Sequence, residues 1–502
     1  MYKRQPQGRV SRRARTTTQA SMSTVTPFSA LSSASSSSST LPSGMPIRLP
    51  AIQASLRERY GTQALIATAR RTRRAVAWPP GRAGAVVRLM RPGFRGGVPG
   101  ASSCAADRLR RGAEPASSRG TGRHHGGGGS YSACMASKDD SVLHIKGRIL
   151  VGADPLDGVR DELWVVGGRI TFDRPTGARD VTTIEGWALP GLVDAHCHVG
   201  LDAHGAVDEP TTEKQALTER HAGALLLRDA GSPSDTRWID DRDDLPRIIR
   251  AGRHIARTKR YIRNYAHEIE PEDLVAYVAR EAKRGDGWVK LVGDWIDRET
   301  GDLSACWPRG AVEAAIAEAH RLGARVTAHC FAEETLAPLV EAGIDCIEHA
   351  TGLTEETIPL FVERGVAIVP TLVNIATFPR LAAGGEGKFP RWADHMRRLH
   401  ERRYATVGAA HDAGIPVYVG TDAGGSLPHG LVAQEVAELV KAGIPAAAAL
   451  SAASWGAREW LGRPGLEEGA PADLVVYDAD PRADVRVLGA PRRVVLRGRV
   501  MA

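Results

Sequence analysis

The chain has 502 residues, of which 42% are hydrophobic and 25% are charged, as is typical of soluble globular proteins. Its formal net charge of +8 is unevenly distributed, because residues 1–134 contain 22 Lys and Arg against 3 Asp and Glu, whereas residues 135–502 carry a net charge of −11. No run of 18 or more apolar residues occurs, so we expect no membrane-spanning segment and no membrane partner. The acidic body likewise predicts that nucleic acid is not a partner.

Residues 1–134 are rich in Ser and then in Arg and Gly, without helical or strand periodicity over any useful length. This composition predicts a disordered basic tail. Three interpretations stay open: native translation starts at Met135, the segment is a transit peptide, or it is a nucleic-acid-binding tail. Few aromatic residues are available in it for base stacking, and Met135-Ala-Ser-Lys begins shortly before the first strand-like segment. We therefore expect a start at Met135.

Cysteine spacing gives no sign of a disulfide framework or of a Cys-based metal site. The six cysteines contain no CxxC pair, and two of them lie in the basic tail. A reducing compartment fits this pattern best, so we expect a cytoplasmic protein. The cysteines are Cys104, Cys134, Cys197, Cys306, Cys330 and Cys346.

Both ends of residues 135–502 have the sequence pattern of a small β domain. Short β-like segments separated by Gly-rich turns precede residue 190, and similar segments return after residue 464. We expect residues 140–190 and 464–502 to pair into one composite β-sandwich domain that flanks the central part of the chain. Its strand-like segments are 142–145, 163–170, 472–477 and 492–496.

Between them, residues 191–463 alternate apolar strand-like segments with amphipathic helices, which indicates βα units and a parallel sheet. One predicted helix begins after Pro308, carries Val312 and Ile316 on one face, and ends at Gly323. Eight such units predict an α/β TIM (β/α)8 barrel. The expected strands are 192–196, 224–228, 247–249, 288–292, 325–329, 346–349, 366–369 and 417–420.

The strongest local signal for chemistry is Asp194-Ala-His196-Cys197-His198 at the end of the first expected barrel strand. Alternate residues of a strand point to the same side, so His196 and His198 share a face and Cys197 points the other way. Two imidazoles on one face are suited to bind a metal ion. Alone, this motif also fits ordinary surface or core histidines.

Other expected strands carry further ligand-type residues in the same relative place. His329 ends the fifth strand, His349 ends the sixth, and Asp422 follows the eighth. Lys290 lies within the fourth. Because the carboxyl ends of TIM-barrel strands meet at one mouth, we expect these residues to join His196 and His198 there.

Lys290 lies in the apolar strand Trp288-Val-Lys-Leu-Val, where a bare ammonium group is costly to bury. Carboxylation of its amine by carbon dioxide would replace the cation with an anionic group that can bridge two metal ions. A free lysine that pairs with an acid or contacts substrate is the alternative.

These residues resemble the amidohydrolase superfamily, in particular its imidazolonepropionase-like and Xaa-Pro dipeptidase-like branch. The resemblance covers residues 142–502. It implies that His196, His198, carboxylated Lys290 and Asp422 bind one buried metal ion, and that His329, His349 and Lys290 bind its more exposed neighbour, both ions being zinc. The motifs are LPGLVDAHCHVGL (189–201), WVKLVGDW (288–295), VTAHCF (326–331), IEHATGL (347–353), VPTL (369–372), VGTDAGG (419–425) and EEGAPADLVVYDADP (467–481).

The loop after the third strand departs from the family pattern, in which many members have Gly-Gly-His near the substrate. This chain has Thr258-Lys-Arg-Tyr261 there. Tyr261 is a candidate donor to a substrate carbonyl, and Lys259 or Arg260 is a candidate for binding a carboxylate. A solvated basic loop is the alternative.

Two single histidines are weaker candidates for substrate binding. His254 lies near the same loop, and His429 follows the metal aspartate. Arg228 and Asp229, at the end of the second strand, are predicted to form a structural ion pair at the barrel mouth.

The sequence therefore predicts a zinc-dependent hydrolase that cleaves a C–N amide bond in a small peptide or an N-acyl amino acid. The attacking group would be a metal-activated hydroxide, and Asp422 would act as general base and then as general acid. Hydrolysis of a cyclic amide, a lactone or an organophosphate ester on the same site stays open, and an inactive structural relative is a remote alternative. We expect a small-molecule substrate and a homo-oligomer.

Overall fold

The structure is a computed structural model that describes residues 141–152, 158–177 and 180–501. Every described residue belongs to the unit Gly126–Ala502. The basic tail and its expected boundary at Met135 lie outside the described residues. Among those that are described, we find no helix with the length and apolar character that a membrane crossing requires.

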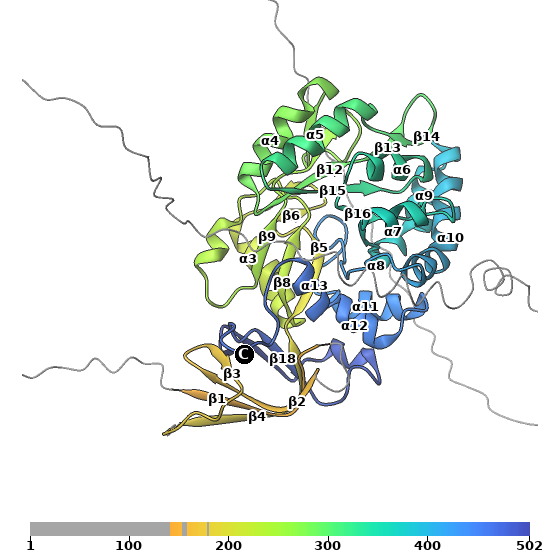
Figure 1. Ribbon diagram of the computed structural model, residues 1–502. Coiled ribbons are helices and arrows are strands. Elements are labelled where there is room, and N and C mark those ends of the chain that lie inside the picture. The colour runs from red at the N-terminus through yellow and green to blue at the C-terminus, as the bar shows by residue number, and fades with distance from the viewer. Residues whose placement is uncertain (1–140, 153–157, 178–179, 502) are drawn as a thin grey trace, which may run out of the picture. The chain divides into compact units, whose positions relative to one another are not determined.

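Strands from both flanks of the chain form one seven-stranded sheet in the order β20-β19-β18-β4-β1-β2-β3. The central strand β4 pairs with β1 in parallel and with β18 antiparallel, so that Leu189 lies opposite Val475. The expected pairing of the two flanks is thus seen in a single described sheet instead of the two facing sheets of a sandwich (Figure 1). The strands are β1 (Val142–Leu150), β2 (Val159–Val166), β3 (Arg169–Thr171), β4 (Val181–Pro190), β18 (Leu474–Tyr477), β19 (Arg493–Leu496) and β20 (Arg499–Met501).

The central part of the chain is built from parallel strands, most of them buried along their whole length, because other elements cover both faces of the sheets. One sheet has the order β5-β8-β9 and the other β11-β10-β12-β15-β16-β17. The first contains β5 (Leu192–Cys197), β8 (Ala224–Asp229) and β9 (Arg247–Arg250). The second contains β10 (Ile255–Arg257), β11 (His267–Ile269), β12 (Trp288–Val292), β15 (Arg325–Cys330), β16 (Cys346–His349) and β17 (Ala367–Val369).

The helices alternate with these strands, and their apolar faces pack on the sheets. The helix expected after Pro308 is observed as α5, which buries Val312 and Ile316, and Gly323 beyond its end adopts a left-handed φ of 79°. The helices are α3 (Glu209–His221), α4 (Leu274–Arg284), α5 (Arg309–Arg321), α6 (Glu333–Glu341), α7 (Ile358–Arg364), α8 (Leu372–Ile375), α9 (Phe378–Gly385), α10 (Pro390–Asp412), α11 (Val432–Lys441), α12 (Ala446–Ala452) and α13 (Trp455–Trp460).

Short elements complete the described chain around this framework. They are the hairpins β6 (Leu201–Asp202) with β7 (Gly205–Ala206) and β13 (Asp294–Asp297) with β14 (Asp302–Ala305), and the 3-10 helices η1 (Arg237–Asp241), η2 (Pro271–Asp273) and η3 (Val485–Gly489).

The segment expected as the eighth strand, 417–420, lies between β17 and β5 but forms only bridges with them. Val417 pairs with Ile368, and Val419 O accepts a hydrogen bond of 2.8 Å from Ala195 N. The described strand pairing is also interrupted between β9, at the edge of the first sheet, and β12 of the second sheet. The fold is therefore of the TIM-barrel α/β type, but its strands form two parallel sheets linked by bridges instead of one closed ring of eight regular strands.

Candidate metal centre

His196 and His198 at the end of β5 bring two imidazole nitrogens to one point, as the alternation of the strand predicted. Their Nε2 atoms lie 3.2 Å apart, and Oδ1 of Asp422 lies 3.1 Å from Nε2 of His196 and 2.9 Å from that of His198. The donor atoms of these three residues all lie within 4.8 Å of one another. Cys197 between the histidines is fully buried and outside this group.

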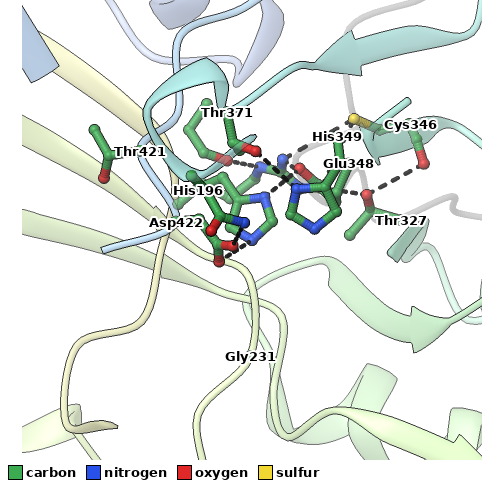
Figure 2. A network of polar contacts seen from close by, with 12 residues as sticks. His196, Gly231, Thr327, Cys346, Glu348, His349, Thr371, Thr421 and Asp422 are labelled. Atoms are coloured by element: carbon green, nitrogen blue, oxygen red, sulfur yellow. Dashed lines mark hydrogen bonds and ion pairs between the residues drawn. The ribbon is translucent and has the colours of Figure 1, made fainter. Parts of the chain in front are cut away.

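Hydrogen bonds on the far side of each ring determine which nitrogens face the group. His196 Nδ1 donates to Glu348 Oε2 at 2.7 Å (Figure 2). His198 Nδ1 donates to Gly231 O at 2.7 Å. Because both oxygens only accept, the Nδ1 atoms carry the protons and the Nε2 lone pairs of the neutral rings point toward Asp422. Three electron-rich atoms at such distances repel one another unless a cation lies between them. The donor set therefore fits a divalent metal ion.

Asp422 reaches this point because its loop has an unusual backbone. It adopts a left-handed φ of 58°, and its N–H, like that of Thr421, donates to His196 O. The Thr421 hydroxyl donates to Asp194 Oδ2 at 2.5 Å, and Asn374 Nδ2 donates to the second oxygen of Asp422 at 2.6 Å.

His329 and His349 lie next to the group of three. The ring of His349 is centred 5.1 Å from that of His196 and 4.7 Å from that of His329. His349 Nδ1 is hydrogen-bonded to Thr371 Oγ1 at 2.7 Å, and His329 Nε2 is buried without a described hydrogen-bond partner, 3.9 Å from Asp294 Oδ1. Burial lowers the pKa of both rings well below the usual histidine value. Both are thus neutral, as metal ligands must be.

Lys290 lies on β12 opposite Thr327 of β15, two positions before the pair of Val292 with His329. Its side chain is buried, and its ammonium group forms no ion pair with a described residue. Burial lowers its pKa in spite of the attraction of Glu348 and Asp422. The structure thus places this lysine in the barrel interior, on the same side as the histidines whose pKa values its charge affects.

Glu348 is a central residue of the site that the sequence interpretation missed. It is fully buried, and besides His196 it accepts hydrogen bonds from Arg228 Nη2 at 2.7 Å and from the Thr327 hydroxyl. Burial acts to raise the pKa of this carboxylate, but the neighbouring positive charges, foremost that of Arg228, hold it well below its ordinary value. An acid that directly precedes the candidate ligand His349 in a buried strand was the available signal.

The expected ion pair between Arg228 and Asp229 is wrong. Arg228 pairs with Glu348, whereas an oxygen of Asp229 accepts a hydrogen bond from Gly231 N at 2.8 Å. Consecutive residues of β8 point to opposite sides of the strand, so their side chains cannot meet.

The structure brings Tyr261 and His254 to the candidate centre. The fully buried ring of His254 is centred 5.0 Å from that of His198, and both its nitrogens are buried without a described partner. The Tyr261 ring is half-buried and is centred 5.3 Å from that of His254 and 5.7 Å from that of His329. Trp295 of β13 packs edge-on against Tyr261 at 4.8 Å. This wall of the site is therefore aromatic.

Two other candidate substrate-binding residues, Arg260 and His429, bind acidic side chains of the protein itself. Arg260 binds Asp297 at 3.2 Å and donates to Trp295 O at 2.9 Å, so its guanidinium is held by the β13–β14 hairpin instead of being free for a substrate carboxylate. His429 Nδ1 forms a 2.8 Å contact with buried Glu219 of α3. The structure places His429 as an anchor of the loop that follows Asp422.

Comparison with known proteins gives four matches. The model of the amidohydrolase family matches residues 187–501. An uncharacterized protein of Mycobacterium tuberculosis is 56% identical over 358 residues, which cover 71% of this chain and 95% of the relative. Ochratoxinase from Aspergillus niger is 26% identical over 230 residues, 44% of this chain and 47% of the enzyme. Among solved structures, a putative prolidase from Bifidobacterium longum matches with a TM-score of 0.62 at 24% identity, over 72% of this chain and 95% of that one.

Proposed function

The chain belongs to the amidohydrolase family, and from this premise we propose that it is a metal-dependent hydrolase that cleaves the C–N amide bond of a small peptide or an N-acyl amino acid. The observation that carries the proposal is the convergence of His196, His198 and Asp422 within 4.8 Å. The names of the prolidase and ochratoxinase relatives support hydrolysis of an amide. The aromatic wall of Tyr261 and Trp295 suits an apolar group beside that amide.

The donor set suits two divalent ions, for which zinc is the best match to imidazole and carboxylate ligands. His196, His198 and Asp422 would hold one ion, and His329 and His349 the second. When bound, the metal supplies Lewis acidity that lowers the pKa of a water molecule and polarises the substrate carbonyl. Each histidine is oriented by a partner or by packing before any ligand arrives, as the bonds of His196 to Glu348 and of His349 to Thr371 illustrate.

Carboxylated Lys290 would complete both ligand sets. Because burial lowers its pKa, a larger fraction of the side chain is a neutral amine, the form that adds to carbon dioxide. The addition forms one N–C bond, releases one proton and yields a carbamate. The resulting anion would lie in a buried strand that already faces His329 on the neighbouring strand β15.

Asp422 is the residue we assign to proton transfer. Its side chain is 21% exposed, and Asn374 holds one of its oxygens. From this position it would accept a proton from the attacking water and donate it to the leaving amine. Tyr261 and His254 would line the substrate site, with the Tyr261 hydroxyl as a donor to the substrate carbonyl. His429 would act on substrate only through the loop that it anchors.

Metal analysis and one histidine substitution test this proposal. Zinc-loaded protein should contain close to two ions per chain and hydrolyse members of a panel of dipeptides and N-acyl amino acids. His196→Ala should abolish turnover and lower the metal content, while the circular dichroism spectrum stays unchanged. His320→Ala, which removes an exposed histidine of α5, is the matched control.

Two outcomes would contradict it. Full turnover by His196→Ala excludes the metal site as the catalytic centre. Hydrolysis of lactones or organophosphate esters without any amide cleavage would keep the site but overturn the assignment of the scissile bond.

A further inference from the structure

A cavity lies at the amino ends of the barrel strands, away from the candidate metal centre at their carboxyl ends. It has a volume of about 250 Å³ and is bordered by Leu225 near the start of β8 and by Arg247, the first residue of β9. Arg458 of α13, Arg463 and Asp473 close its other sides. One water molecule occupies about 30 Å³ of liquid, so the cavity has room for a small ligand together with solvent.

Arg458 is the buried residue of this cavity. It is only 4% exposed, donates from Nε to Gly191 O at 2.9 Å and from Nη1 to Pro464 O at 3.3 Å. Its Nη2 is buried and has no partner among the described residues. Two backbone carbonyls do not neutralise a guanidinium, and a buried donor without an acceptor is destabilising. Burial lowers the pKa of Arg458 to about 10 even though Asp473 attracts its charge.

Positive charge exceeds negative charge around the cavity. Three arginines border it, whereas Asp473 is the acid among its described lining residues. Both oxygens of Asp473 are occupied, because Oδ1 accepts from Arg497 N at 2.8 Å and Oδ2 lies 3.8 Å from Arg247 Nε. Arg463 is exposed and forms no ion pair with a described residue.

We propose that this cavity is a binding site for a small oxyanion of the phosphate or carboxylate type, held by Arg458 from inside and by Arg247 and Arg463 from the rim. Guanidinium forks match such oxygens in pairs, which is why arginine predominates where phosphates and carboxylates are bound. The anion supplies the acceptor that Arg458 Nη2 lacks. It also connects the segment between α13 and β18, which carries Arg463 and Asp473, to the barrel strands.

Titration of the full-length zinc-loaded protein with inorganic phosphate tests the site, with acetate in a parallel titration and sodium chloride at equal ionic strength as reference. Arg247→Gln/Arg463→Gln removes the two rim cations and keeps the buried Arg458 in place. Arg398→Gln, an exposed arginine of α10 at a distant position in the chain, is the control for loss of charge. Calorimetry should show saturable binding of about one anion per chain to the wild type and to Arg398→Gln, with at least tenfold weaker binding to the double variant.

The result separates this site from the metal centre. Phosphate that binds equally well to the wild type and to the double variant is bound elsewhere, for example at the metal ions, and overturns the proposal. Absence of saturable binding by either anion to the wild type also overturns it. Tighter binding of acetate than of phosphate would identify a carboxylate as the ligand, and the reverse order a phosphate. Amide hydrolysis should be the same in all three proteins, so the outcome does not depend on the proposed reaction.

Discussion

The two ends of the barrel strands differ in how they accommodate buried charge. At the carboxyl ends, Glu348 and Arg228 are both fully buried, and they form an ion pair in a network that includes His196. At the amino ends, Arg458 has only backbone carbonyls and one unpartnered nitrogen. Each guanidinium keeps one buried nitrogen without a described hydrogen-bond partner, Arg228 Nη1 and Arg458 Nη2. The two ends therefore differ in the acid: Arg228 binds the carboxylate of Glu348, whereas Arg458 donates only to backbone carbonyls, so its charge is left for another anion to compensate.

The largest effect we predict is on stability at the carboxyl ends. Glu348→Ala should lower the free energy of unfolding by about 3–5 kcal/mol, because it leaves the guanidinium of Arg228 buried without its carboxylate. Urea denaturation of both proteins measures the difference. Arg228→Met combined with Glu348→Ala should recover part of the loss, since no unpaired charge remains. A loss below about 1 kcal/mol in the single variant would show that the network does not stabilise the fold.

The next effect concerns metal binding. Glu348→Gln keeps the shape of the side chain but weakens the bond that orients His196 Nδ1, so metal affinity should fall by about 10–100-fold. Competition with a chromophoric chelator measures the affinity directly, and far-ultraviolet circular dichroism checks the fold. Glu348→Asp keeps the carboxylate but should still bind metal more weakly than the wild type, because its shorter side chain cannot reach both His196 and Arg228. Unchanged affinity in Glu348→Gln would remove this carboxylate from the metal site.

A smaller effect is expected at the amino ends. Arg458→Met removes two hydrogen bonds to carbonyls but also relieves the burial of an incompletely satisfied cation, so the unfolding free energy should fall by less than about 2 kcal/mol. The same urea denaturation, in buffer free of phosphate and carboxylates, measures it. A loss as large as that of Glu348→Ala would show that backbone carbonyls stabilise the buried guanidinium of Arg458 as well as Glu348 stabilises that of Arg228. It would contradict the contrast between the two ends.

Sequence periodicity predicted the strands of the barrel because their alternation is local. It also placed His196 and His198 on one face and Cys197 on the other, which the structure bears out. The eighth expected strand was less regular, since Asp422 just after it needs a left-handed backbone to turn back on His196. An apolar pattern does not report such a turn.

Partners that come from different strands were beyond the reach of the sequence. Glu348 of β16 and Arg228 of β8 are 120 residues apart and meet only in the folded barrel. The mistaken pair of Arg228 with Asp229 could have been avoided, because neighbours in a strand point to opposite sides. The roles of His254 and Tyr261 follow from their distance to His198 and His329, which no spacing in the sequence encodes.

The smallest effect we predict concerns the β13–β14 hairpin, which carries Trp295 of the aromatic wall. It tests whether contacts between charged groups hold this hairpin in place, as they hold the network at the carboxyl ends of the strands. His395 of α10 lies 2.8 Å from Glu333 of α6 and 2.9 Å from Asp302 of β14, and a hydrogen bond with Glu333 is the main cause that raises its pKa despite partial burial. A group with a raised folded-state pKa contributes stability below its unfolded pKa of about 6.5, and this contribution is lost as pH rises through the folded value. The unfolding free energy of the wild type should therefore fall more between pH 6 and about pH 8 than that of His395→Gln. Parallel pH profiles for the two proteins would show that α10 holds the β13–β14 hairpin by packing and not by this charge.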